Sequence, residues 1–240
     1  NYDRFSEELS ASRKAFRHAK SHPDFIGLHA AILSDWGRTQ EALDLIDRSL
    51  SRAGNPANLL VLKGDVLLRM SRSDEGKSRE AIRAGAFRLF EKAREADPSN
   101  INAHYRPGSL LAYERRTTEA LPLLRRTAEL SPFSTEIHQS LWGAIQGQAE
   151  LPLEKRSAEV EADIRSLLRA RGDYPGTLLA VSQQYGGMGL KARRKEIDAR
   201  ILKQFPDSRE AEWVLVNRYR DFAEEHDGEE MKRPAVRAEY

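Results

Sequence analysis

The stretch that decides the fold runs from Ile101 to Ser134 and reads INAHYRPGSLLAYERRTTEALPLLRRTAELSPFS. An apolar run, a short polar break and a second amphipathic run follow one another in it, and Pro132 closes it. The same pattern returns at equal length from Pro175 to Ser208, closed by Pro206. A period of about 34 residues is typical of stacked helical hairpins. The sequence therefore predicts an all-α helical-repeat fold.

Composition agrees with such an array. Apolar residues make up 40% of the chain and charged residues 32%, which favours a thin, extended core over a thick globular one. The 39 basic and 37 acidic residues nearly balance, so the net charge of +2 gives little long-range attraction for nucleic acid or an anionic membrane. Cysteine is absent, which excludes disulfides, thiolate zinc sites and cysteine nucleophiles. No apolar run approaches the roughly 18 residues of a membrane span.

The chain begins at Asn1 without a methionine or a signal-type apolar segment. From this we expect a processed or excised piece of a longer protein. We expect a soluble protein that is cytoplasmic or, if an export signal was removed, periplasmic or extracellular. The sequence leaves the oligomeric state and the identity of any partner open.

Apolar residues recur at three- and four-residue spacing along most of the chain, which predicts amphipathic helices. We expect residues 1–22 to form the second helix of a truncated or capping repeat, residues 23–222 to form the repeat domain, and residues 223–240 to form a charged, frayed tail. The expected units of the domain are about 23–56, 57–100, 101–134, an irregular 135–174, 175–208 and a capping helix at 209–222.

The unit at 57–100 is about ten residues longer than its neighbours, and the extra length falls on the polar segment from Ser71 to Glu80. We expect this segment to form a longer loop or an extended helix end. Insertions of this kind lie at the edge of a stack, where they can contact a ligand.

Several kinds of residue recur at fixed places in the units. A small residue lies in the middle of the first run, a larger apolar one follows three positions later, a glycine marks the turn, an alanine comes early in the second run, and a proline closes the unit. Glycine and alanine let two backbones approach, and proline stops a helix. The small residues are Ala30, Gly64 and Gly108, the larger ones Leu33, Leu67, Leu111 and Tyr185, the turn glycines Gly37 and Gly189, the alanines Ala42, Ala86 and Ala120, and the prolines Pro98, Pro132 and Pro206.

This set of positions resembles the tetratricopeptide repeat (TPR) family. The resemblance covers roughly Pro23 to Tyr219 and is weakest from Thr135 to Asp173. It implies a right-handed α-α superhelix whose concave face, lined by the first helices, holds a partner. The first helices offer Tyr and Arg, which dominate interface hot spots, and such a face suits an extended peptide or a helix. The implied inward positions are Asn58, Val61, Asp65, Arg69, Asn102, Tyr105, Arg106, Ser109, Tyr113, Gln139 and Gln146, with Glu136 beside them.

The sequence thus predicts a non-catalytic protein-protein interaction scaffold with no catalytic residue, no metal and no cofactor. Its partner is a protein or peptide. One alternative is the recruiting arm of a longer multidomain enzyme or an envelope assembly, and another is a groove that stays solvated. TPR domains that grip a free chain-terminal carboxylate use Lys, Asn and Arg on first helices, but Gly27 and Ala31 occupy the corresponding positions here. We therefore predict no carboxylate clamp.

A further alternative is weak RNA binding along an Arg-rich edge formed by residues 115–116, 125–126 and 193–195. Acidic residues are interleaved with these basic ones, and no aromatic residues alternate with them. Solvated helix faces with local ion pairs are the favoured interpretation, and nucleic acid is not the expected partner.

Two short motifs imitate functional sites. The sequence Gly76-Lys77-Ser78 matches the end of a phosphate-binding loop, but Ser71 stands where the first glycine belongs. His18 and His22 have the spacing of a helical zinc site, yet Pro23 places His22 at a helix end. We predict neither nucleotide binding nor a metal site.

Overall fold

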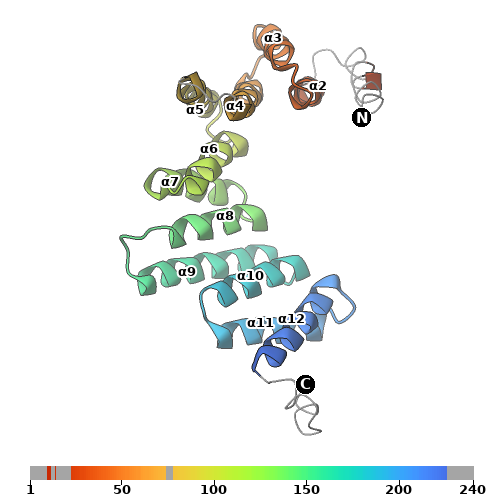
Figure 1. The fold of residues 1–240 in the computed structure, drawn as a ribbon, viewed down its shortest axis with the longest axis vertical. Helices are drawn as coiled ribbons and strands as arrows, with labels where there is room; N and C mark the ends of the chain where they lie inside the picture. The colour runs from red at the N-terminus through yellow and green to blue at the C-terminus, as the bar shows by residue number, and fades with distance from the viewer. Residues whose placement is uncertain (1–9, 12–13, 15–22, 74–77, 226–240) are drawn as a thin grey trace. The chain divides into compact units, whose positions relative to one another are not determined.

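The computed structural model describes residues 10, 11, 14, 23–73 and 78–225, and over these residues its regular structure is entirely helical (Figure 1). The predicted all-α helical-repeat fold is confirmed. The helix expected in residues 1–22 falls almost wholly outside the described residues, as does the tail from 226. The helices are α2 (Pro23–Asp35), α3 (Thr39–Leu50), α4 (Ala57–Ser73), α5 (Ser78–Ala96), α6 (Ile101–Tyr113), α7 (Thr117–Leu130), α8 (Thr135–Gln146), α9 (Leu153–Arg171), α10 (Pro175–Gly187), α11 (Lys191–Gln204) and α12 (Arg209–Glu225).

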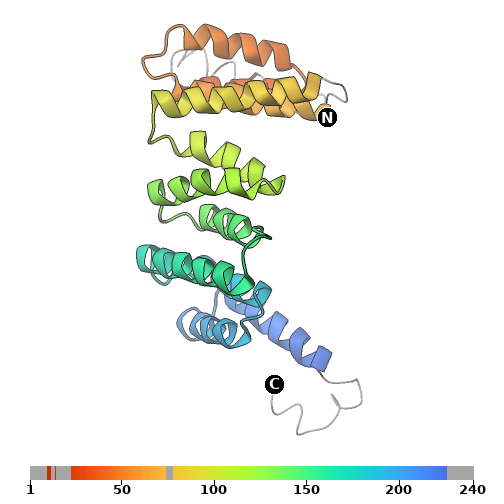
Figure 2. The same cartoon turned by 90° about the vertical axis from the view of Figure 1, so that its left-hand side faces the viewer.

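The chain divides into two compact units, Asn1–Ser131 and Pro132–Tyr240. The first unit contains the hairpins α2–α3, α4–α5 and α6–α7, and the helices of a hairpin lie side by side (Figures 1 and 2). Its first helices also touch in order, α2 against α4 and α4 against α6. Two buried clusters hold the hairpins together. The first joins α2 and α3 to Leu59 and Val66 of α4, and the second joins α4 and α5 to Ala103 of α6.

Small residues set how closely the helices of a hairpin approach. A Cβ atom added to Gly64 would lie 2.8 Å from the ring of Phe90, and one added to Gly108 would lie 3.1 Å from Leu123 and Leu124. Ala30, the small residue of the first hairpin, is fully buried in the cluster that joins α2 and α3. The sequence prediction of close approach at small residues is confirmed for Gly64 and Gly108.

The turns within the hairpins α2–α3, α6–α7 and α10–α11 each contain a residue with left-handed backbone. Gly37 has φ of 76° and Gly189 has φ of 73°, which confirms both as turn glycines. At the corresponding place between α6 and α7 stands Arg115, with φ of 64°. It is the one non-glycine residue with positive φ among the described residues. Glycine adopts this conformation without cost, whereas the Cβ of other residues is crowded there.

The closing prolines lie just beyond their helices, because proline cannot continue the hydrogen-bonded backbone. Helix α5 ends at Ala96 before Pro98, α7 ends at Leu130 before Pro132, and α11 ends at Gln204 before Pro206. The extra residues of the second hairpin lengthen both of its helices, since α4 continues to Ser73 and α5 begins at Ser78. The sequence left two expectations for this insertion, a longer loop or an extended helix end. The described residues agree with the extended helix end.

The second unit contains the hairpins α8–α9 and α10–α11, followed by α12. Helix α9, from Leu153 to Arg171, is the second helix of the unit that the sequence predicted to be irregular. It carries Asp163, whose Oδ2 accepts hydrogen bonds of 2.6 Å from Trp142 Nε1 and 2.7 Å from His138 Nδ1. Both partners belong to α8 and are buried. One carboxylate therefore joins the two helices of this hairpin.

The close approach at Gly108 is open to a direct test. We expect Gly108→Leu to lower the free energy of unfolding by about 1–3 kcal/mol, because the side chain must displace Leu123 and Leu124. Gly143 on α8 is a matched control, since an added Cβ there meets no atom within 4 Å. Gly143→Leu should leave stability unchanged or raise it by up to about 1 kcal/mol. Chemical unfolding followed by circular dichroism measures both, and equal effects would contradict the packing role of Gly108.

Candidate partner-binding surface

The residues expected to face a partner in the first unit lie on α4 and α6, and they differ in exposure. Val61 is only 6% exposed and packs in the buried cluster beneath the surface. Tyr113, at the end of α6, is 86% exposed. The others divide into the exposed Asn58, Arg69, Asn102 and Arg106 and the partly buried Asp65, Tyr105 and Ser109.

Polar links join consecutive first helices along this surface. Arg69 of α4 forms an ion pair with Asp35 of α2. Arg106 Nε of α6 lies 3.4 Å from Asp65 Oδ2 of α4. Asn100 Nδ2, at the start of α6, donates a 2.6 Å hydrogen bond to Asn58 Oδ1 of α4. Four of the expected residues, Asn58, Asp65, Arg69 and Arg106, thus contact polar partners on a neighbouring hairpin.

Sequence reasoning missed Asp35, although a signal for it was present. Asp35 and Arg69 are 34 residues apart, which is one repeat period. Opposite charges one period apart lie at the same place on consecutive first helices, where they can pair. Asn100 carried no such signal, because it precedes its helix as the N-cap residue.

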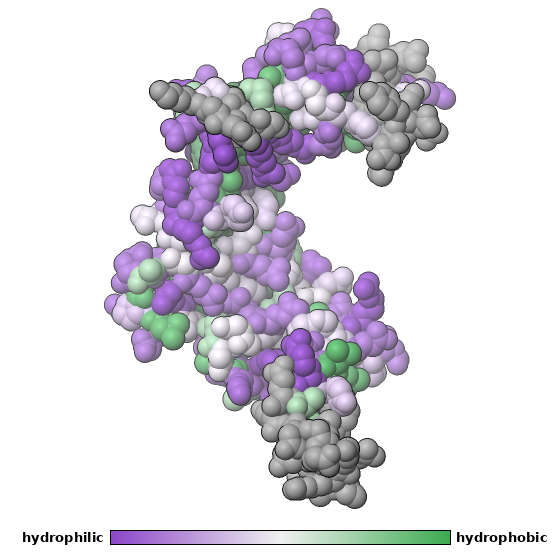
Figure 3. All heavy atoms as spheres, in the orientation of Figure 1, coloured by the Kyte–Doolittle hydropathy of each residue, from purple (hydrophilic) through white to green (hydrophobic). Residues whose placement is uncertain are grey.

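The surface is polar and close to neutral. Its two ion pairs match each guanidinium with a carboxylate. Burial raises the pKa of Asp65 above its ordinary value, and the charge of Arg106 opposes that rise. On the face of the molecule that Figure 3 shows, hydrophilic residues predominate and hydrophobic ones form small separate groups. Amide, hydroxyl and phenol groups therefore supply much of what this surface offers a ligand.

The remaining expected residues, Gln139 and Gln146, lie on α8 and so belong to the second unit. Gln139 is exposed and Gln146 is partly buried, and Glu136 beside them is exposed. The first helices of this unit also touch in order, α8 against α10 and α10 against α12. Each unit thus has its own row of first helices.

One arginine of each basic cluster, Arg116, Arg126 or Arg193, forms a local ion pair of the kind that the sequence predicted. Arg126 pairs with Glu129 at 2.9 Å, and Arg193 lies 3.6 Å from Glu196. Arg116 holds Glu119 with two hydrogen bonds of 2.7 Å. Charges satisfied in this way are less available to the phosphates of RNA.

The motifs that imitate functional sites are largely untested by the structure. Ser78 is simply the first residue of α5, while Gly76, Lys77, His18 and His22 lie outside the described residues. Within the described ranges, no group of three or more His, Asp or Glu side chains is placed to hold a metal ion. No helix in those ranges combines the length and apolar character that crossing a membrane requires.

Several solved structures are similar to this chain in fold. PilF of Pseudomonas aeruginosa aligns with a TM-score of 0.53 and 12% identity, over 90% of this chain and 91% of that one. MamA of Desulfovibrio magneticus RS-1 aligns with a TM-score of 0.50 and 17% identity, over 78% and 97%. YrrB, a TPR protein with an unusual peptide-binding site, aligns with a TM-score of 0.49 and 19% identity, over 88% of this chain and 99% of that one. No family model matches the sequence, and no curated protein matches it either.

PilF and MamA are TPR proteins, so the chain has a TPR-like fold. At this level of identity the likeness concerns the arrangement of helices alone. The family resemblance seen in the sequence is confirmed at the level of fold.

The raised pKa of Asp65 predicts a pH dependence of stability. The folded protein holds the Asp65 proton more tightly than the unfolded chain does, so stability contributed by this group falls as pH rises from the ordinary value near 3.9 through the raised pKa. We expect the wild type to lose stability relative to Asp65→Asn across that window, measured by chemical unfolding at a series of pH values.

Asp97 provides a control of opposite sign. Hydrogen bonds from the side chain and backbone of Ser99 lower the pKa of Asp97. Stability from this group is present above the ordinary value and lost as pH falls through the lowered pKa. Relative to Asp97→Asn, the wild type should therefore gain stability with rising pH in the range below about 3.9. The same sign for both variants would contradict the environment described for Asp65.

Proposed function

We propose that this chain is a non-catalytic scaffold that holds a peptide or a helix of a partner protein on the row formed by α2, α4 and α6. The observation that carries the proposal is the set of polar and aromatic side chains that consecutive first helices present together. Asn102 and Tyr113 are exposed on α6, and the Asp65–Arg106 pair lies between α4 and α6. A TPR-like arrangement of hairpins is consistent with this use.

The chemistry of the row suits a polypeptide. A peptide backbone presents one donor and one acceptor per residue, and an Asn amide both donates and accepts. A tyrosine ring supplies contact area at low cost in side-chain entropy. The ion pairs hold Arg69 and Arg106 in place, so a partner meets side chains that are already ordered. The same row would serve a recruiting arm within a longer protein.

Site-specific photocrosslinking tests the location. A photoreactive residue at Asn102 should form adducts with a bound polypeptide, because this position is exposed on α6. Lys92, exposed on α5, is the matched control and should form none. Equal labelling at the two positions would place the partner elsewhere.

A variant supplies the energetic test. We expect Tyr105→Ala to weaken capture of the crosslinked partner by about 1–3 kcal/mol while helicity is retained. Titration of the partner measures the affinity, and circular dichroism measures the helicity. Unchanged affinity would remove Tyr105 from the binding surface, and lost helicity would assign it to packing.

A further inference from the structure

Three helix-to-helix turns in this chain share one hydrogen-bond pattern. In each, the residue after the left-handed position donates its backbone N–H to the carbonyl five residues earlier: Arg38 to Leu33 at 2.8 Å, Arg116 to Leu111 at 2.9 Å and Leu190 to Tyr185 at 2.9 Å. This is the hydrogen bond by which a left-handed residue caps a helix C-terminus. Glycine occupies the left-handed position in two turns, and Arg115 occupies it in the third.

Arginine is a poor choice for this backbone. A left-handed conformation crowds the Cβ of a non-glycine residue, and Asn and Asp tolerate it best among the others. The two glycine turns form the same hydrogen bond, so the arginine side chain adds nothing to the turn geometry. Residues with a strained backbone conformation are found preferentially at functional sites. The strain at Arg115 therefore suggests that its side chain binds a ligand.

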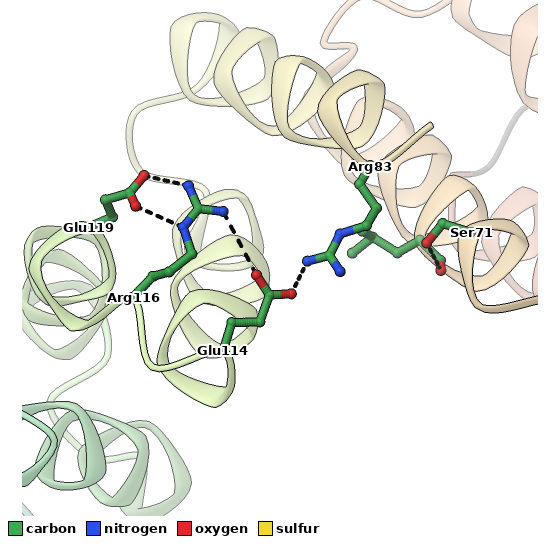
Figure 4. Close-up of polar contacts among 6 residues, drawn as sticks. Ser71, Arg83, Glu114, Arg116 and Glu119 are labelled. Carbon is green, nitrogen blue, oxygen red and sulfur yellow. Dashed lines mark hydrogen bonds and ion pairs between the residues drawn. The ribbon is translucent and has the colours of Figure 1, made fainter. Parts of the chain in front are cut away.

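The charges around the turn are matched except for that of Arg115. Figure 4 shows Arg83 of α5 pairing with Glu114, and Arg116 lying between Glu114 and Glu119. The guanidiniums of Arg83 and Arg116 are thus satisfied by two carboxylates. Arg115 is exposed, and among the described residues its side chain has no hydrogen bond or ion pair.

Tyr113 lies beside this unmatched charge. It precedes Arg115 by two residues, so the two Cα atoms are within about 7.6 Å of each other. Its side chain is 86% exposed. The ion pairs on both sides of the turn fix the backbone that carries Tyr113 and Arg115. The turn thus presents an exposed phenol ring and an exposed guanidinium two residues apart, the residue types that dominate interface hot spots.

We propose that the α6–α7 turn docks an acidic segment of a partner polypeptide, with an Asp or Glu carboxylate on Arg115 and an adjacent apolar side chain on Tyr113. A guanidinium fork matches a carboxylate with two parallel hydrogen bonds. The inference rests on the proposed function in taking the partner to be a polypeptide.

Local charge favours a peptide carboxylate over a nucleic acid. One unmatched guanidinium can neutralise one carboxylate. A polyanion would bring further charges close to Glu114 and Glu119, which flank the turn in sequence.

The test uses a fluorescently labelled peptide of Gln and Leu that carries a single Glu beside a Leu, called the Glu peptide, with the same peptide bearing Gln in place of that Glu as the uncharged comparison. We expect the wild type to prefer the Glu peptide in fluorescence anisotropy. Arg115→Gly should bind the Glu peptide about tenfold more weakly while its Tm rises by about 2–4 °C, because glycine relieves the backbone strain. A purely structural arginine would lower the Tm when replaced.

Two further variants separate charge from backbone. Arg115→Lys should retain part of the preference for the Glu peptide, since it keeps the charge without the planar fork. Gly189→Arg introduces the same strain at the corresponding turn of the second unit. It should lower the Tm by about 2–4 °C and leave peptide binding unchanged.

Each contrary result has a defined meaning. Equal binding of the two peptides by the wild type, undiminished binding by Arg115→Gly, or competition by poly(U) RNA as strong as that by unlabelled Glu peptide would overturn the acidic docking point. Adducts at Asn102 and weakened capture by Tyr105→Ala, with no effect of Arg115→Gly, would leave the proposed function standing and remove only the docking point.

Discussion

The close approach of two helices at small residues is the constraint on which the rest of the first unit depends. Gly64 lies against the ring of Phe90, and Gly108 lies against Leu123 and Leu124. This contact fixes which side of each first helix is buried in its own hairpin. A helix has only a few faces, so the sides away from the second helix are left for neighbouring first helices and for solvent. The location of the candidate surface follows from the packing of the hairpins.

Much of this fold could be predicted from sequence because its determinants are local. Turn glycines, closing prolines and apolar spacing each act within one hairpin, and Gly37, Gly189 and Pro132 behave as expected. The exposure of individual residues was harder to predict. Val61 has the spacing of a surface position, but packing against the cluster that includes Phe90 buries it. Small rotations of a helix move a residue between surface and core, and periodicity does not define those rotations.

Contacts between elements far apart in sequence escaped prediction for a different reason. Asp163 accepts hydrogen bonds from both Trp142 and His138, and this requires a helix register that residue spacing does not specify. Asp35 could have been paired with Arg69 from the repeat period alone. The strain at Arg115 became visible only when its backbone could be compared with that of the glycine turns. Repeat proteins permit this comparison because each hairpin serves as a reference for the others.

The polar links between first helices have a mechanical consequence. Arg69 is bound to Asp35 at an exposed edge, where dissolved ions weaken the attraction, whereas Leu59 and Val66 sit in the apolar cluster behind it. Rising ionic strength should therefore weaken the Arg69–Asp35 link at the edge of the row and leave the apolar contacts behind it unaffected. The first unit would then be stiff along its apolar core and more flexible along this polar edge, to a degree set by the salt concentration.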